Sequence, residues 1–239
     1  MLEIKNLNMD YPKKLGVADI NLQIQKGQVI GLFGENGMGK TTLIKLLVGI
    51  YKPQKGGEIL YGGKKLDYKM YNEIAYISEE LSLFDDWNIY DHRDFYQLAY
   101  ENFNYERFNK LLKFFNLAKE MEKVKTFSKG QKAKLELAIG FSKGAKYIFM
   151  DEPFLGSDAL TRADFLKIMA GFMEEDDTII IATHLLTEIE QFIDRAIFMR
   201  YGKIKADYTA EQLLENNGLM ETAKEIFEYD PNKINDIIT

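Results

Sequence analysis

Hydrophobic residues in the first quarter of the chain follow two different patterns. The segments LEIKNL and INLQIQ alternate apolar and polar residues, as strands with one buried face do. In contrast, Val29–Phe33 (VIGLF) is apolar throughout, which is typical of a strand covered on both faces. Further on, KGGEILYGGKKL has glycine pairs around a short apolar run and predicts a hairpin. These patterns predict an antiparallel sheet beside a buried strand.

The centre of the chain has helical spacing instead. Between Ile89 and Phe141, aromatic and apolar residues recur at helical intervals, and no strand pattern interrupts them. Buried strands return in YIFMDE and TIIIATH, and we expect a helix between them from about Asp158. Residues 216–239 are expected to form a short helical or partly ordered end.

Together these elements predict the α/β fold class. We expect a single domain over residues 1–239, because α/β folds of this length are common. Its core would comprise residues 1–88 and 142–210, with a helical lobe inserted at 89–141 and a short C-terminal tail at 211–239.

Composition narrows the functional classes. Of 239 residues, 46% are hydrophobic, which is enough for a folded core. The net charge of −6 and the absence of a long basic run argue against a nucleic-acid partner. The chain has no cysteine for a disulfide or a thiolate zinc site. The sequence has no signal-peptide pattern and no run of roughly 18 apolar residues, so we expect a cytoplasmic protein whose membrane role, if any, needs a partner.

A candidate phosphate site follows the buried strand at Val29–Phe33. The segment GENGMGKTT matches G-x-x-x-x-G-K-[ST] between an expected strand and an expected helix. Glycines adopt positive φ readily, so backbone N–H groups can turn toward an anion. The lysine would neutralise phosphate, and the hydroxyl beside it can bind Mg²⁺. The candidate nucleotide-binding residues are Gly34, Glu35, Asn36, Gly37, Met38, Gly39, Lys40, Thr41 and Thr42, with Lys40 also catalytic and Thr41 also a metal ligand.

Two acids end the apolar segment Tyr147–Glu152. A buried carboxylate is costly without a partner, so acids at a strand end suggest a nearby cation. Asp151 is the candidate Mg²⁺ ligand, and Glu152 is the candidate base that polarises the attacking water. An ordinary boundary between strand and loop would also place two solvated acids here, but the phosphate motif in the same chain favours catalysis.

The segment FSKGQKAKLELAIGF at Phe127–Phe141 resembles the signature motif of ABC ATPases, usually written LSGGQ. Ser128, Gly130 and Gln131 match that motif, whereas its first and third positions differ. The segment precedes the acidic strand, as in the family, and no D-x-x-G or N-K-x-D motif of a GTPase is present. The chain therefore resembles the ATP-binding subunit of an ABC transporter over roughly residues 1–210.

Three further residues gain roles from this resemblance. FLGSDAL resembles the family's D-loop with Asp158 as its acid, and THLLTE resembles the switch motif with His184 as its histidine. Tyr11 stands where the family has an aromatic ring that stacks on adenine. Without the resemblance, His184 would be interpreted as structural and Tyr11 as a packing residue. With it, we expect His184 to contact the γ-phosphate as a catalytic residue and Tyr11 to bind the base.

The resemblance also implies a fold and partners. The fold would be a P-loop NTPase core with an antiparallel β subdomain and an inserted helical subdomain. ATP and Mg²⁺ would be the cofactors, and a second copy or a paralogous ATPase subunit would pack head to tail, each signature contacting the other's ATP. Ser128 also begins a helix, so it can be an N-cap as well as an anion ligand. A separate integral-membrane permease would hold the chain at the inner face of the cell membrane.

Glu79 is a departure from the family, which usually has a glutamine at this metal-binding position; Glu80 is the alternative alignment. A carboxylate could still approach Mg²⁺, but it adds negative charge and cannot donate a hydrogen bond. Together with Lys129 in the signature, this acid favours an exporter of the ABC-2 or the peptide and drug type. The SLFDDWNIY segment that follows has two interpretations: it would either dock the permease or fill the core of the helical lobe. The side chains that would do so are Leu83, Phe84, Trp87 and Tyr90.

Two other functions compete with transport. A soluble ABC ATPase of DNA maintenance or translation would usually carry a long coiled-coil insertion or a second cassette, and this sequence contains neither. A regulatory ATP-binding module would usually have lost the acid that stands here as Glu152.

Overall fold

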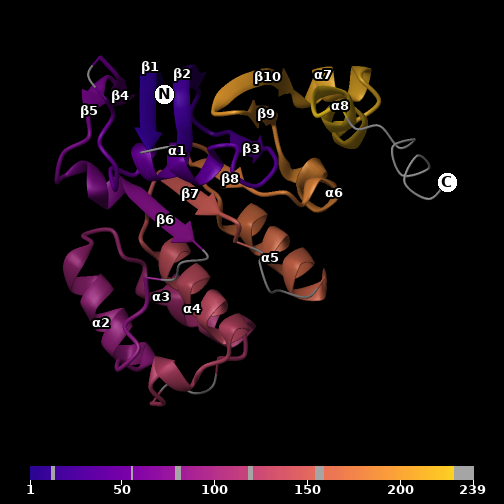
Figure 1. Ribbon diagram of the computed structural model, residues 1–239. Coiled ribbons are helices and arrows are strands. Elements are labelled where there is room, and N and C mark those ends of the chain that lie inside the picture. Colours follow the sequence, from indigo (N-terminus) through magenta and orange to yellow (C-terminus); the bar gives the residue numbers. More distant parts are fainter. Residues whose placement is uncertain (12–13, 55, 79–81, 118–120, 154–158, 229–239) are drawn as a thin grey trace.

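The computed structural model describes residues 1–11, 14–54, 56–78, 82–117, 121–153 and 159–228 (Figure 1). Two sheets lie in its upper part, and the helices α2 to α5 lie mainly below them. Within the described ranges, no helix combines the length and the hydropathy needed to cross a bilayer.

The smaller sheet is antiparallel, with strand order β2-β1-β4-β5. Burial alternates along β2 from Ile20 to Ile24, as the sequence pattern predicts, whereas a register shift between Ile4 and Leu7 interrupts the alternation in β1. The hairpin predicted from the glycine pairs is confirmed as β4 and β5. The strands are β1 (Leu2–Tyr11), β2 (Lys14–Ile24), β4 (Glu58–Tyr61) and β5 (Lys64–Lys65).

The larger sheet has six strands in the order β10-β9-β3-β8-β7-β6, and its neighbours from β9 to β6 are parallel. Every residue of β3, β7 and β8 is buried, which confirms the prediction from their continuous apolar runs. The sequence analysis assigned no strand to β6, β9 or β10. The strands are β3 (Val29–Phe33), β6 (Ile74–Ser78), β7 (Tyr147–Asp151), β8 (Thr178–Ala182), β9 (Arg195–Arg200) and β10 (Lys203–Thr209).

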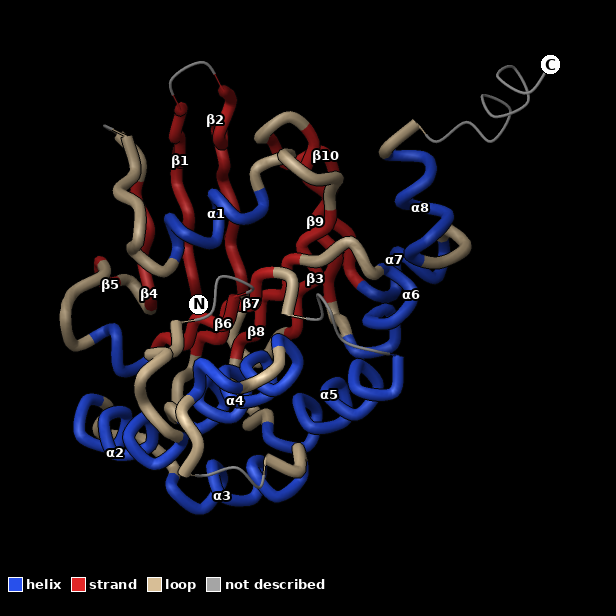
Figure 2. Tube along the Cα trace, turned by 60° about the horizontal axis from the view of Figure 1, so that its bottom comes forward, coloured by secondary structure: helices blue, strands red, loops and turns tan. Residues whose placement is uncertain are grey.

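Helix α1 (Lys40–Leu47) lies between the two sheets. Its Leu43 and Leu46 belong to one buried cluster with residues of both sheets, such as Leu2 and Phe149 (Figure 2). Because this helix packs on both sheets, the turn that precedes it is held at the edge of the larger sheet.

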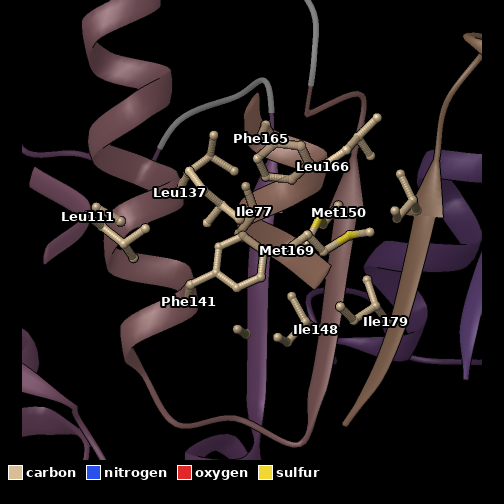
Figure 3. Packing of buried hydrophobic residues seen from close by; sticks show 14 of the residues in the cluster. Ile77, Leu111, Leu137, Phe141, Ile148, Met150, Phe165, Leu166, Met169 and Ile179 are labelled. Carbon is tan, nitrogen blue, oxygen red and sulfur yellow. The ribbon is translucent and has the colours of Figure 1, made fainter. Parts of the chain in front are cut away.

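The expected helical region contains α2 (Ile89–Ala99), α3 (Tyr105–Phe114) and α4 (Lys129–Ser142). Helix α5 (Ala159–Phe172) connects β7 to β8, close to the predicted start. Side chains from these helices interdigitate with those of β6 and β7, as Phe141, Phe165 and Ile77 show (Figure 3). Two single turns precede β6 and α4 and span Met70–Glu73 and Val124–Thr126.

Residues 210–226 are more deeply buried than the sequence analysis expected. Helices α7 (Ala210–Glu215) and α8 (Leu219–Ile226) confirm a helical end, and Leu213, Leu219 and Ala223 are buried in the main cluster. Leu219 N–H also donates to Glu190 Oε1 at 2.6 Å. This bond joins α8 to the turn Glu190–Phe192, which directly follows α6 (Leu186–Ile189). The segment 229–239 lies outside the described residues.

Candidate active site

One edge of the larger sheet gathers the candidate residues. In the parallel register, Ser78 is opposite Asp151, and both Asp151 and Leu32 are opposite Ala182. The carboxyl ends of β3, β8, β7 and β6 therefore lie level with one another. Ligands of open α/β sheets bind at such an edge, because the connecting loops meet there.

Glycines shape the turn between β3 and α1 in two ways. Gly37 and Gly39 have φ of 82° and 102°, a region that residues with a side chain rarely adopt. Gly39 is also crowded, since a Cβ there would lie 2.7 Å from the Gly16 carbonyl oxygen, whereas a Cβ on Gly37 would meet nothing within 4 Å. A Cβ on Gly34 would lie 2.7 Å from the Met199 carbonyl oxygen. The glycines thus permit both the turn and its close packing.

The turn is braced by residues that the sequence analysis did not identify. Gly202 N–H donates to the Met38 carbonyl at 3.1 Å, and Tyr201 N–H lies 3.1 Å from Met38 Sδ. Ala18 N–H in turn donates to the Gly202 carbonyl at 2.8 Å. The tyrosine and glycine of the β9–β10 turn give a hairpin signal in the sequence, but no local pattern links them to a turn so far away in the chain.

Lys40 is buried, with 6% of its side chain exposed, at the start of α1. Its Nζ donates to the Gly34 carbonyl at 2.6 Å and lies 3.8 Å from Glu152 Oε1. Burial lowers the pKa of Lys40, and the negative charges of Glu152 and Asp151 oppose that shift. The ammonium is therefore held among acceptors at the place where an anion would bind.

Thr41 and Asp151 come together as the sequence analysis anticipated. Thr41 Oγ1 donates to Asp151 Oδ1 at 3.1 Å, which joins the first turn of α1 to the end of β7. Burial raises the pKa of Asp151, while the Thr41 hydroxyl and the Lys40 charge work in the opposite direction. A hydroxyl and a buried carboxylate are oxygen ligands of the kind Mg²⁺ takes.

Glu152 has a left-handed backbone conformation, with φ of 48°. Its N–H donates to the Ala182 carbonyl at 2.8 Å, and its Oε2 lies 3.0 Å from His184 Nδ1. Its other oxygen, Oε1, is buried and has no hydrogen-bond partner among the described residues. His184 is half exposed, so it is no core histidine, and it approaches Glu152 from the end of β8.

Tyr11 lies beside the phosphate turn. Its OH is 3.2 Å from Thr42 Oγ1, and its ring meets the Tyr51 ring edge-on, with centroids 6.2 Å apart. These contacts are those of a packing residue, which is how Tyr11 would be interpreted without the family resemblance. Adenine stacking stays a prediction. Glu35 and Asn36 are exposed at the front of the turn.

The signature residues lie elsewhere in the molecule. Ser128 is the N-cap of α4, with Gln131 N–H donating to its Oγ at 3.2 Å and its own N–H donating to Gln131 Oε1 at 2.9 Å. The N-cap role is thus confirmed. Helix α4 lies well away from α1 in both views (Figures 1 and 2), so the structure does not bring the signature to the phosphate turn of the same chain.

Two predicted site residues, Glu79 and Asp158, lie outside the described residues, as does the alternative Glu80. In the segment SLFDDWNIY, some residues fit the lobe core and others fit an exposed docking surface. Leu83 packs against the main hydrophobic cluster, whereas Phe84 is 45% exposed and stacks on Trp87 with ring centroids 4.2 Å apart.

The site combines a buried lysine and a neighbouring hydroxyl at the start of α1 with two consecutive acids at the end of β7. This combination defines a P-loop nucleotide hydrolase. The family of ABC transporters matches residues 17–155. The chain belongs to this family, and it is an ATP-binding, ATP-hydrolysing subunit of an ABC transporter. The predicted ABC ATPase fold is also confirmed.

Individual relatives agree with this assignment. The chain is 31% identical to a lantibiotic transport ATP-binding protein, SrtF, of Streptococcus pyogenes over 90% of its own length and 94% of the relative's. It is 29% identical to the ABC-type transporter ATP-binding protein EcsA of Bacillus subtilis, with 93% of each chain covered. A solved structure of an ATP-binding subunit of an ABC transporter superposes with a TM-score of 0.84, at 27% identity, over 95% of this chain and 99% of that one.

Proposed function

We propose that this subunit hydrolyses ATP at composite sites formed by two copies packed head to tail. The observation that carries the proposal is Glu152, whose carboxylate lies between Lys40 and His184 with one buried oxygen lacking a hydrogen-bond donor among the described residues. Such an oxygen suits the proton of an attacking water. Water would attack the γ-phosphorus, Glu152 would hold the water's proton, and ADP and phosphate would leave.

The other residues of this edge would bind and orient the nucleotide. Backbone N–H groups of Gly34–Thr42 and the start of α1 would hold the phosphates, with Lys40 neutralising their charge. His184 would contact the γ-phosphate, and Tyr11 would stack on adenine. Exposed Glu35 and Asn36 would face the second copy.

Mg²⁺ fits the pair formed by Thr41 and Asp151. Their oxygens are already 3.1 Å apart, and Asp151 is a buried carboxylate that a cation would stabilise. When bound, Mg²⁺ would neutralise charge on the β- and γ-phosphates. Glu79 is the third proposed ligand, from the segment outside the described residues.

The position of the signature supports a second copy. Because α4 lies away from α1 in both views, Ser128, Gly130 and Gln131 would contact the ATP of the partner copy rather than their own. Asp158 would lie at the same interface. An N-terminus of this fourteen-residue helix attracts an anion, which suits a γ-phosphate.

We also propose that a separate membrane permease docks on the docking segment, Ser82–Tyr90. The exposed ring of Phe84, stacked on Trp87, would receive a short helix of the permease. The subunit would then be held at the inner face of the cell membrane. Transport would be outward, a direction that rests on Lys129 in the signature and Glu79 at the lobe junction.

The test is ATP hydrolysis measured against protein concentration, together with gel filtration in MgATP. We expect the wild-type rate to rise faster than linearly, because two copies form each site. Glu152→Gln should turn over about 10²–10³-fold more slowly and should elute as a dimer with ATP. The matched control is Glu175→Gln, an exposed acid before β8, at the opposite end of the sheet. A rate strictly proportional to concentration, from a monomer, would refute the composite site.

A further inference from the structure

Glu136 is a buried carboxylate on α4 that the proposed catalytic cycle does not use. Only 4% of its surface is exposed, and a buried acid needs strong partners. Both of its oxygens have one: Oε1 accepts from Ser82 Oγ at 2.7 Å, and Oε2 accepts from Ser82 N–H at 3.2 Å. A single residue of the docking segment therefore donates to both oxygens of the carboxylate.

The surroundings of this contact draw on three parts of the helical lobe. Tyr96 OH of α2 lies 3.5 Å from Ser82 Oγ, and the buried ammonium of Lys143 lies over the rings of Tyr96 and Tyr100. Burial raises the pKa of Glu136, whereas the Ser82 hydrogen bonds and the Lys143 charge lower it. The cluster thus joins a buried carboxylate and a buried ammonium to the exposed start of the docking segment.

Helix α4 is also held to the sheet one turn further along. A Cβ on Gly140 would lie 2.5 Å from Ile77 of β6, so the helix backbone and that strand are in close contact. Glu136 and Gly140 are four residues apart and therefore share one face of α4. That face contacts β6 at Gly140, and it contacts the segment leaving β6 at Glu136.

The contact joins two functional surfaces of the lobe. Ser82 begins the docking segment, next to Leu83 and Phe84, and it bonds to Glu136 of α4. Ser128 is the N-cap of that same helix. Glu136 follows Ser128 by eight positions, a separation of about 12 Å along the helix. A displacement of Ser82 would therefore move α4 as a rigid element, including its signature end.

We propose that Glu136 is a positioning residue that couples the docking segment to the signature end of α4 through its hydrogen bonds to Ser82. The proposal rests on the function proposed above. Permease contact at Phe84 and Trp87 would be relayed by Ser82 and Glu136 to the signature, and ATP held at the signature would act back on the docking segment by the same contact.

The chain contains a natural reporter for this coupling. Trp87 is its single tryptophan, and it lies in the docking segment against Phe84. In a Glu152→Gln background, which is expected to hold the ATP-bound dimer, MgATP should therefore shift the emission of Trp87. Glu136→Gln should abolish that shift, and Ser82→Ala, at an exposed position that leaves the core intact, should weaken it.

Turnover gives a second readout. With Glu152 intact, Glu136→Gln should lower kcat about tenfold with little change in KM, because a charge-assisted hydrogen bond is lost while the phosphate turn is untouched. Asp177→Asn is the matched control, since Asp177 is also buried and also accepts a backbone N–H, from Glu174, but lies before β8. It should retain both the Trp87 shift and the wild-type kcat.

The outcomes separate this inference from the proposed function. If the wild type neither hydrolyses ATP nor dimerises with it, the proposed function fails and this inference fails with it. If the wild type is active and Glu136→Gln keeps its kcat and its Trp87 shift, Glu136 is a structural charge and the inference alone is wrong. If Glu136→Gln does not fold, Ser82→Ala decides: an unchanged shift and kcat overturn the coupling.

Discussion

The phosphate-binding edge and the helical lobe both rest on an apolar core, yet they are held in different ways. At the edge, backbone bonds join neighbouring strand ends, as in Glu152 N–H to Ala182 and Thr183 N–H to Leu32. In the lobe, two backbone bonds join the docking segment to the turn before α4, from Val124 N–H to Trp87 and from Lys125 N–H to Asp85. Its links to α4 itself are side-chain contacts, such as Lys132 with Asp85. Exposed ion pairs of this kind stabilise little.

This difference suggests a division of labour. A site for phosphoryl transfer needs groups fixed within fractions of an ångström, and a buried parallel sheet supplies that rigidity. A lobe that responds to a partner needs contacts that can be exchanged without unfolding the domain. The following predictions test that division, from the largest expected effect to the smallest.

The largest effect should follow Lys40→Met. Losing the ammonium should lower ATP hydrolysis by about 10³-fold or more, because it is the principal cation at the phosphate site. We expect the melting temperature without nucleotide not to fall, because burial lowers the pKa of Lys40 and desolvating its charge is unfavourable. Paired turnover and thermal unfolding measurements check both parts. A large loss of stability with retained turnover would contradict this view of the edge.

A phenylalanine in each region offers a direct comparison of stability. Phe33 of β3 is 1% exposed, so Phe33→Ala should cost about 3–5 kcal/mol. Phe84 of the docking segment is 45% exposed, so Phe84→Ala should cost about 1 kcal/mol, of the order of its remaining burial. Urea unfolding of both variants measures the difference. Equal costs would mean that the docking segment is as firmly packed as the sheet.

The phosphate turn itself provides a matched pair of glycines. Gly39→Ala meets both a positive φ and the Gly16 carbonyl oxygen, so it should cost more than the roughly 1–3 kcal/mol of backbone strain alone. Gly37→Ala has the strain without the clash and should cost less. ATP affinity and urea unfolding of the two variants should rank in that order. The reverse order would show that Gly39 packs against β2 less tightly than its geometry indicates.

The smallest effect concerns pH and the buried His92. Its Nδ1–H donates to the Asn88 carbonyl at 2.8 Å, and its Nε2 accepts Phe84 N–H at 2.9 Å, which requires a neutral ring. Burial lowers the pKa of His92. Since the unfolded histidine binds its proton near pH ~6.5, full stability is present above that pH and is lost as the pH falls through the window down to the folded pKa.

The measurement for His92 is the free energy of unfolding as a function of pH, from about pH 8 to about pH 5.5, a range that brackets the pKa of an unfolded histidine at about 6.5. His92→Gln should flatten the profile relative to the wild type. The chain has only one other histidine, so His184→Gln is the control, and it should keep the slope due to His92. Identical profiles for wild type and His92→Gln would refute the prediction.

Much of the nucleotide edge was predictable because its signals are local. The apolar run Val29–Phe33, the glycine turn and Lys40 are contiguous in sequence, so their strand, turn and helix follow from neighbouring residues. The two acids after the apolar run at Tyr147–Asp151 were predictable for the same reason. Their catalytic and metal-binding roles remain predictions.

Other features had no local signal. The brace on Met38 comes from Tyr201 and Gly202, and the partner of Glu136 is Ser82, each pair far apart in the chain. Strand β6 went unnoticed beside more conspicuous apolar runs. The burial of Leu219 and Ala223 places α8 in the core, which its short helical pattern does not show.

The sequence by itself determined most of the elements and the chemistry they carry, because hydrophobic period, turn residues and motif spacing all act between neighbours. Only the tertiary structure decided which chemistry meets. Parallel strand register brings Lys40, Thr41, Asp151, Glu152 and His184 to one edge, whereas α4, the helix that Ser128 caps, lies away from α1. The physical reason is that contacts between distant residues depend on how whole elements pack, and packing is a property of the assembled core rather than of any one segment.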